Sequence, residues 1–238
     1  LYLPIAVLIV FSFNASRLSA GWHGWSFRWY DALWGDAALH AAVGNSLAVA
    51  GISTVIVLLL AVPAAMGVER VAARWRGVVE PMLLMPLVIP EVVMGVSLLL
   101  LFVAVQAPLS LATVILGHAA FNLPVAMLIL RARLQKLDAR LIEAARDLGA
   151  SPWQAFRRVT LPLLAPALLG AGLLAFTMSL DDFVVTFFVA GPGSTTVPLK
   201  VYSMIKSGLS PEINALSAVL VVVSMGLVGL SVLFQRRA

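Results

Sequence analysis

The chain has no cysteine among its 238 residues, which excludes disulfide bonds, thiolate metal sites and cysteine nucleophiles. Charge is also scarce, because Asp, Glu, Lys and Arg make up 11% of the residues, against about 25% in a typical soluble domain. No G-x-x-x-x-G-K-[ST] motif is present, so the chain has no P-loop to hold nucleotide phosphates. H-E-x-x-H and other clusters with metal-ligand spacing are absent as well. These absences exclude a soluble enzyme, a nucleic-acid-binding domain and a P-loop ATPase.

Apolar residues are abundant, at 61% of the chain, and their excess predicts an all-α integral membrane protein. A helix needs about 20 apolar residues to cross the hydrocarbon layer. The first apolar segment is too short to cross and has no basic flank, so we interpret it as the remainder of a truncated span rather than a signal peptide. We expect one transmembrane domain over residues 1–238. Its six spans are predicted near Leu1–Phe13, Ser46–Val68, Pro81–Val105, Leu109–Leu130, Ala165–Ala190 and Asn214–Phe234.

The basic residues predict the orientation of these spans. Twelve of the 16 Lys and Arg residues lie in the connections 69–80 and 131–164 or after residue 235. By the positive-inside rule these segments, and with them both termini, are cytoplasmic. The opposite connections hold the other four, which are Arg17, Arg28, Lys200 and Lys206.

Two segments are predicted on the outer side. Residues 14–45 contain four tryptophans, which are typical of an aromatic belt at the headgroup level, although a docking surface for an extracytoplasmic partner is an alternative. Val197–Leu209 has the pattern of a short amphipathic surface helix, either solvated or in contact with a partner. Ser210-Pro211-Glu212 then has the composition of an N-terminal cap for the last span.

The cytoplasmic connection 131–162 is the most strongly patterned part of the chain. Asp138 can cap a helix over Ala139–Leu148, and Gly149 suits its left-handed end. Ser151-Pro152 then predicts a second helix, with an apolar face at Trp153, Phe156 and Val159 and an end at Leu161-Pro162. Two capped helices with an apolar stripe indicate a surface on which another protein sits.

Residues of this connection resemble the EAA loop of ABC importer permeases. Glu143-Ala144-Ala145, Gly149 and the segment Val159-Thr160-Leu161-Pro162 keep the spacing of that motif, and the one departure is Val159 in place of Ile. The resemblance implies a six-helix type I ABC importer permease fold and a loop that docks into a cytoplasmic ATPase dimer. It also implies that ATP and Mg²⁺ bind the ATPase and that this chain holds no cofactor. The expected coupling residues are Glu143, Ala144, Ala145, Gly149, Phe156, Leu161 and Pro162.

A finer resemblance covers nearly the whole chain. The segments Ser12-Phe13-Asn14, Phe176–Phe183 with Gly191-Pro192, and 210–216 are similar to those of spermidine/putrescine importer permeases, in particular the second of the two permease subunits. This resemblance implies a bacterial inner-membrane location, a second homologous permease as a heterodimeric partner and a periplasmic polyamine-binding protein. It implies no nucleic-acid partner.

Three acidic residues fall inside the predicted spans, where a charge costs about 2.5–3.5 kcal/mol at the helix centre. Glu91 is expected about 15 Å into the third span, next to a helix break at Pro90, and Asp181 and Asp182 about 24 Å into the fifth. We expect them to line the pathway of a cationic substrate. Neighbouring helix positions diverge by about 100°, so one of the two aspartates is free to pair with another helix instead. A protonated helix contact is the alternative for Glu91.

His118 and Asn122 lie one helical turn apart in the fourth span and predict a hydrogen-bonded contact between helices.

Other functions remain compatible with the sequence. A permease for another small organic cation or an amino-acid-like solute would need the same features. A gradient-driven secondary transporter or channel would use the intramembrane acids as a relay, but it does not explain the capped cytoplasmic loop. An intramembrane aspartyl protease would require Glu91 to converge with one aspartate on a single water, since Asp181 and Asp182 point apart.

Overall fold

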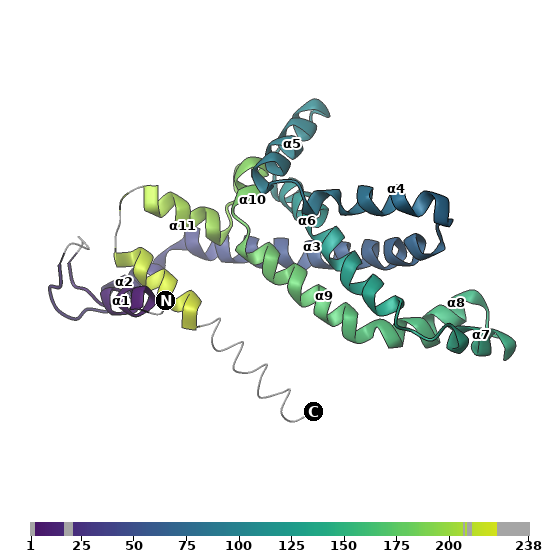
Figure 1. Ribbon diagram of the computed structural model, residues 1–238. Coiled ribbons are helices and arrows are strands. Elements are labelled where there is room, and N and C mark those ends of the chain that lie inside the picture. Colours follow the sequence, from purple (N-terminus) through teal and green to yellow (C-terminus); the bar gives the residue numbers. More distant parts are fainter. Residues whose placement is uncertain (1–2, 17–20, 207, 209–210, 223–238) are drawn as a thin grey trace, which may run out of the picture. The chain divides into compact units, whose positions relative to one another are not determined.

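The computed structural model describes residues 3–16, 21–206, 208 and 211–222. The regular elements of these residues are helices, accompanied by one isolated β-bridge between Asn14 and Trp25 (Figure 1). The helices are α1 (Leu3–Phe11), α2 (Arg28–Gly35), α3 (Ala37–Arg70), α4 (Ala73–Leu84), η1 (Met85–Leu87), α5 (Glu91–Ala104), α6 (Leu111–Leu134), α7 (Ala139–Asp147), α8 (Pro152–Ala155), η2 (Phe156–Thr160), α9 (Leu161–Asp181), α10 (Val184–Val189) and α11 (Val197–Lys206). A further apolar helix covers Pro211–Val222.

Contacts between residues divide the chain into two compact units. Unit 1 combines residues 1–43 with 199–238, and unit 2 covers residues 44–198. Helices α3 and α11 contribute residues to both units. Both functional segments predicted from the sequence, the connection 131–162 and the three intramembrane acids, belong to unit 2.

The core of unit 2 is built from α3, α6 and α9. Small buried side chains such as Ala61, Ala119 and Ala175 allow these helices to approach closely, and Val57, Met127 and Leu130 fill the space between them. Close approach through small residues is typical of helix packing in membranes. Large apolar side chains such as Leu59, Leu169 and Leu173 are exposed, as expected for faces that meet lipid or another membrane subunit.

Among the described residues, three helices are long and apolar enough to cross a membrane, namely Ala37–Arg70, Leu111–Leu134 and the continuous stretch Pro152–Asp181. A fourth candidate, made of Arg74–Leu87 and Glu91–Ala104, is bent by 98°. The helix break expected at Pro90 is therefore confirmed, and the predicted span Pro81–Val105 is not a straight helix. Pro86 and Pro90 explain the break, because each proline removes a backbone donor and Pro90 disfavours the helical conformation at the residue before it.

Other predicted span limits also need correction. Helix α3 begins at Ala37, nine residues before the predicted start, because the helix continues beyond its apolar part. The fifth span does not run unbroken to Ala190, since α9 ends at Asp181 and α10 starts at Val184. The first predicted span contains α1, which has nine residues. Of the sixth, only the part up to residue 222 lies within the described residues.

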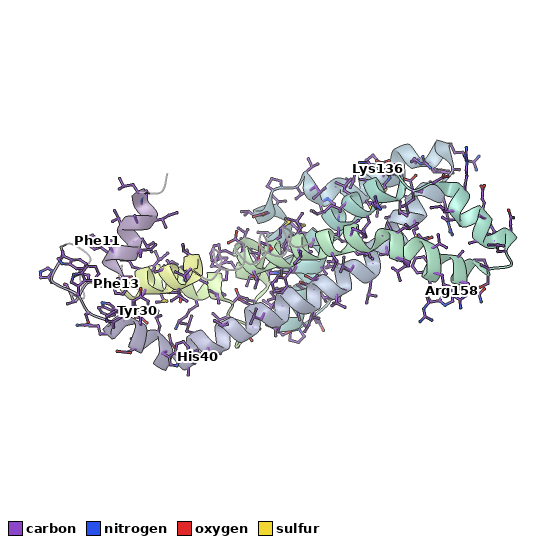
Figure 2. All side chains as sticks on the ribbon, turned by 90° about the horizontal axis from the view of Figure 1, so that it is seen from below. Phe11, Phe13, Tyr30, His40, Lys136 and Arg158 are labelled. Atoms are coloured by element: carbon purple, nitrogen blue, oxygen red, sulfur yellow. The ribbon has the colours of Figure 1, made fainter. Side chains whose placement is uncertain are left out.

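Unit 1 is held together by aromatic and polar contacts. Phe13 and Tyr30 pack with their ring centroids 5.2 Å apart, close to Phe11 (Figure 2). Asn14 is fully buried, and its side-chain amide donates to the carbonyl of Gly21 at 2.6 Å. The indole of Trp29 donates to the carbonyl of Asn14 at 2.7 Å. Most of the outer tryptophans are exposed, whereas Trp29 is a core residue of this unit.

Helix α11 agrees with the amphipathic segment predicted over Val197–Leu209 up to Lys206, while Leu209 lies outside the described residues. Lys200 is not simply solvated, because its ammonium lies 2.8 Å from Asp36 Oδ2. The capping role predicted for Ser210 also falls outside the described residues, of which Pro211–Val222 are helical.

Candidate functional site

The connection 131–162 folds as two capped helices. The Asp138 carboxylate accepts a hydrogen bond from the amide of Arg140 at 2.9 Å and begins α7. Gly149 follows α7 with φ of +86°, a left-handed conformation that favours glycine. Ser151 then begins α8 in a capping box, where its hydroxyl accepts from the amide of Gln154 and the Gln154 side chain accepts from the amide of Ser151. These three caps confirm the helix–turn–helix predicted from the sequence.

The second helix of this connection does not end at Leu161-Pro162. It passes through a π-helical turn, η2, directly into α9 and makes one continuous stretch from Pro152 to Asp181. Proline normally interrupts a helix because its ring collides with the carbonyl four residues earlier. The wider π turn just before Pro162 gives that ring room, so α8 is joined rigidly to a membrane-spanning helix.

Most of the predicted coupling residues are accessible to another protein. Glu143, Ala144 and Gly149 are exposed, and Ala145 and Phe156 are half-buried. Phe156 stacks on the exposed Trp153 with ring centroids 5.5 Å apart. Lys136 and Arg158, which both belong to this connection, lie toward the same end of unit 2 (Figure 2).

A groove of about 300 Å³ lies between the end of α7 and the second helix. Leu148 on its rim is 89% exposed. The groove is lined by Ala145, Leu148, Gly149, Ala150, Gln154, Ala155, Arg158 and Val159.

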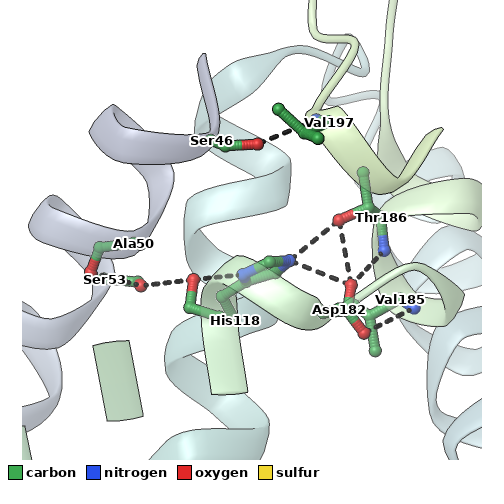
Figure 3. Close-up of polar contacts among 9 residues, drawn as sticks. Ser46, Ala50, Ser53, His118, Asp182, Val185, Thr186 and Val197 are labelled. Carbon is green, nitrogen blue, oxygen red and sulfur yellow. Dashed lines mark hydrogen bonds and ion pairs between the residues drawn. The ribbon is translucent and has the colours of Figure 1, made fainter. Parts of the chain in front are cut away.

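A second polar site lies at the break between α9 and α10 (Figure 3). Asp182 has an extended backbone there, and its carboxylate accepts hydrogen bonds from the amides of Val185 at 3.2 Å and Thr186 at 2.9 Å. The hydroxyl of Thr186 also donates to this carboxylate, at 2.9 Å. Asp182 therefore supplies acceptors for the orphan amides at the start of α10.

His118 joins this break to α6. Its Nε2 lies 3.1 Å from Asp182 Oδ2 and 2.9 Å from Thr186 Oγ1, and its Nδ1 lies 2.6 Å from Ser179 Oγ. Ser179 in turn lies 3.3 Å from Ser53 on α3, so the polar chain connects three helices and α10 (Figure 3). The predicted interhelical contact of His118 is confirmed. Asn122 is fully buried, but neither polar atom of its amide has a partner among the described residues.

The three predicted pathway acids have different surroundings. The Asp182 side chain is 6% exposed and held within the protein, whereas Asp181 is exposed at the last residue of α9. Glu91 is exposed and opens α5 directly after the 98° bend. The position of Glu91 about 15 Å into the membrane was calculated for a straight helix, so it does not apply to a helix pair bent by 98°. Helices α5 and α10 pack against each other so tightly that a Cβ on Gly95 would lie 2.6 Å from the Phe188 ring. Glu91 is the first residue of α5, and Asp181 ends the helix that precedes α10.

Sequence reasoning did not find Ser53, Ser179 and Thr186. Thr186 follows Asp182 by four residues, a spacing that could have indicated a local contact. Ser53 and Ser179 reach the network only through helix packing between residues 126 positions apart, for which the sequence carries no local signal.

Comparison with known proteins identifies the family. Residues 58–238 match the family model described as "Binding-protein-dependent transport system inner membrane component". The chain belongs to this family. It is therefore a multi-pass component of a membrane transport system and is not itself an ATPase.

Two relatives of this permease match over nearly its full length. The putrescine transport system permease protein PotI of Escherichia coli K12 is 43% identical over 237 residues, covering 96% of this chain and 84% of the relative. The spermidine/putrescine transport system permease protein PotC of the same organism is 40% identical over 236 residues, covering 99% of this chain and 89% of the relative.

A solved structure supports the fold of the permease. The crystal structure of a bacterial ABC transporter that imports the acidic polysaccharide alginate aligns with a TM-score of 0.77 at 18% identity, covering 100% of this chain and 90% of that chain. A second structure of an alginate transporter, in complex with a pentasaccharide-bound periplasmic protein, aligns with a TM-score of 0.71 at 17% identity, covering 94% of this chain and 86% of that chain. The all-helical ABC importer permease fold expected from the EAA-type loop is confirmed.

Proposed function

We propose that this permease is one of two membrane subunits of an ATP-driven importer of polyamines such as putrescine and spermidine. The observation that carries the substrate class is the near full-length similarity to PotI and PotC. A second homologous permease, a periplasmic polyamine-binding protein and a cytoplasmic ATPase dimer complete the proposed importer. ATP and Mg²⁺ belong to the ATPase, and this chain binds no cofactor.

The docking site for the ATPase is the connection 131–162. Its three caps and the continuous helix into α9 make it stiff, and the exposed Leu148 and Trp153 offer apolar contacts beside the groove. A stiff element on the outside of a helix bundle transmits a displacement instead of absorbing it. This assignment requires the connection and the C-terminus to be cytoplasmic, as the distribution of Lys and Arg favours.

Glu91 and Asp181 are the proposed contacts for the amine substrate. An ammonium group that enters a narrow path loses hydration, and a carboxylate replaces it. Both acids are exposed, one at the start of α5 and the other at the end of α9, whereas the Asp182 carboxylate is engaged with His118 and the start of α10. We therefore assign Asp182 a structural role. It stabilises the break between α9 and α10, next to which Asp181 lies.

Reconstitution of the assembled complex in liposomes tests this function. With the loaded binding protein outside and ATP inside, labelled putrescine or spermidine should accumulate, and excess diamine or triamine should compete whereas neutral analogues should not. Uptake of another organic cation or an amino acid in preference to polyamines would contradict the substrate class. Amine flux through this chain alone, driven by an ion gradient without nucleotide, would establish a secondary transporter instead.

A further inference from the structure

Arg131 is the buried centre of an ionic cluster at the junction of three helices, and its partners Glu69 and Glu80 are 29% and 32% exposed. It lies near the end of α6 with 9% of its surface exposed, and its Nε donates to Glu69 Oε1 on α3 at 2.6 Å. A second guanidinium nitrogen contacts the Glu80 carboxylate on α4. Gln135, one turn beyond Arg131, donates to the same Glu69 oxygen at 3.0 Å. We call these four residues the Arg131 clamp.

The clamp is suited to fixing geometry. An ion pair with one buried partner contributes little net stability, because desolvation of the guanidinium opposes the attraction, but it favours one arrangement of the helices that carry its members. The flat guanidinium presents donors in fixed directions and can hold two carboxylates at once, which a lysine ammonium cannot reproduce. Arg131 therefore sets the position of α4 relative to α3 and α6.

The clamp also stands at the base of the connection 131–162. Two residues later, Arg133 Nε donates to the carbonyl of Leu163 at the start of α9, at 3.2 Å. The start of the connection thus contacts α3 and α4 through Arg131, and Arg133 links it to the start of α9. Glu80 extends this tie to α4, which leads through η1 to the bend at Glu91.

We propose that Arg131 is a positioning residue that passes movement of the connection 131–162 to α4, and through α4 to the α4–α5 bend that carries Glu91. The proposal rests on the proposed function, because it requires an ATPase that moves this connection. In the clamp, Glu80 connects Arg131 to α4, and Glu69 connects it to α3.

The test uses the assembled complex in liposomes and two readouts. The first is the amount of polyamine imported per ATP hydrolysed. The second is the nucleotide-dependent fluorescence change of a probe attached through Met82→Cys, an exposed position on α4 in a chain that has no native cysteine, with the accessible cysteines of the partner subunits removed. Arg74→Gln is the matched control, because it removes an exposed cation from the same helix without touching the clamp.

Glu80→Gln should lower import per ATP about tenfold and abolish the probe response, while ATP hydrolysis stays within about twofold of the wild type. Arg131→Gln should do the same, and Arg131→Lys should recover only part of the coupling. Arg74→Gln should match the wild type in both readouts.

Several results would overturn the proposal. One is a Glu80→Gln complex that keeps normal import per ATP and a normal probe response. Another is a parallel loss of import and hydrolysis, which would indicate a role in folding or assembly alone. Should Arg131→Gln fail to assemble, Glu80→Gln decides, because it leaves the pairing of Arg131 with Glu69 in place. The probe reports on nucleotide and not on cargo, so a wild-type complex that responds without importing polyamines would refute the substrate class and leave the clamp intact.

Discussion

Asp181 and Asp182 are neighbours in the sequence but differ in their surroundings. Asp182 accepts hydrogen bonds from two backbone amides and a hydroxyl and lies next to His118. Among the described residues, the Asp181 carboxylate has no hydrogen-bond or ion-pair partner. The end of helix α9 between them causes this difference, because it turns the two side chains into different environments. Asp182 thus holds the local structure, and the exposed Asp181 is the acid that we propose as a substrate contact.

This division predicts different effects for the two neutral variants. Asp181→Asn should lower polyamine uptake about tenfold, because one charge-assisted hydrogen bond contributes about 1.5–3 kcal/mol, while ATP hydrolysis and thermal stability remain normal. Asp182→Asn should lower the thermal unfolding midpoint of the complex, at a cost of about 1–3 kcal/mol, because His118, Thr186 and the first amides of α10 lose one of the two carboxyl oxygens that they contact. Uptake assays and thermal unfolding of both variants check this, and two variants that behave alike would contradict it.

The helical elements of the connection 131–162 were predictable because their signals are local. Asp138, Gly149 and Ser151-Pro152 each act within one helical turn, so the residues that determine these caps are close neighbours in the sequence. The continuation of the second helix through Pro162 was not predictable in this way. It depends on a π turn, and a proline in the sequence gives no sign that such a turn will accommodate it.

The intramembrane elements show the same limit. Composition located most of the apolar segments, but it did not indicate where they bend or end. The 98° bend before Glu91 and the end of α9 at Asp181 changed the surroundings of all three predicted acids. The partners of His118 and Arg131 come from helices far apart in the sequence, so only packing brings them together.

Gly149 provides a test of rigidity at the level of this element. A Cβ at Gly149 would meet no atom within 4 Å, so Gly149→Ala acts only through its φ of +86°, at a cost of about 1–2 kcal/mol. We expect the variant to weaken the stimulation of ATP hydrolysis by the loaded binding protein at least several-fold, because the turn between α7 and α8 loses its shape. Gly170→Ala is the matched control, since its Cβ also meets nothing but its backbone is helical. Equal stimulation in both variants would show that the shape of this turn is not needed for coupling.

At the scale of the whole molecule, unit 1 is assembled from both ends of the described chain. Trp29 and Leu33 of α2 pack with Ala215 and Leu216, which follow more than 180 positions later. One ion pair reinforces this assembly, between Asp36 and Lys200. The Asp36 carboxylate also accepts from the amides of Ala38 at 2.8 Å and Leu39 at 3.1 Å and thereby begins α3.

The Asp36–Lys200 pair makes the stability of this unit depend on pH. The hydrogen bond from Lys200, aided by the two amides and opposed by burial, holds the pKa of the Asp36 carboxyl below its ordinary value. The unfolded chain therefore takes up this proton first as the pH falls. The stabilisation from Asp36 is complete above the ordinary carboxyl pKa of about 4 and is lost as the pH drops through the lower value of the folded protein.

Thermal unfolding midpoints of the complex between pH 6 and pH 3 test this dependence. The wild type should lose stability below about pH 4 more steeply than Asp36→Asn, whose side chain does not titrate, and Lys200→Gln should show the same flattening because the carboxyl loses its main partner. Lys206→Gln is the control. Its ammonium lies over the Tyr202 ring, 5.4 Å from the centroid, so the variant should keep the wild-type profile. If Asp36→Asn and Lys206→Gln gave the same profile, the contact between Asp36 and Lys200 would not be the cause of the stability loss at low pH.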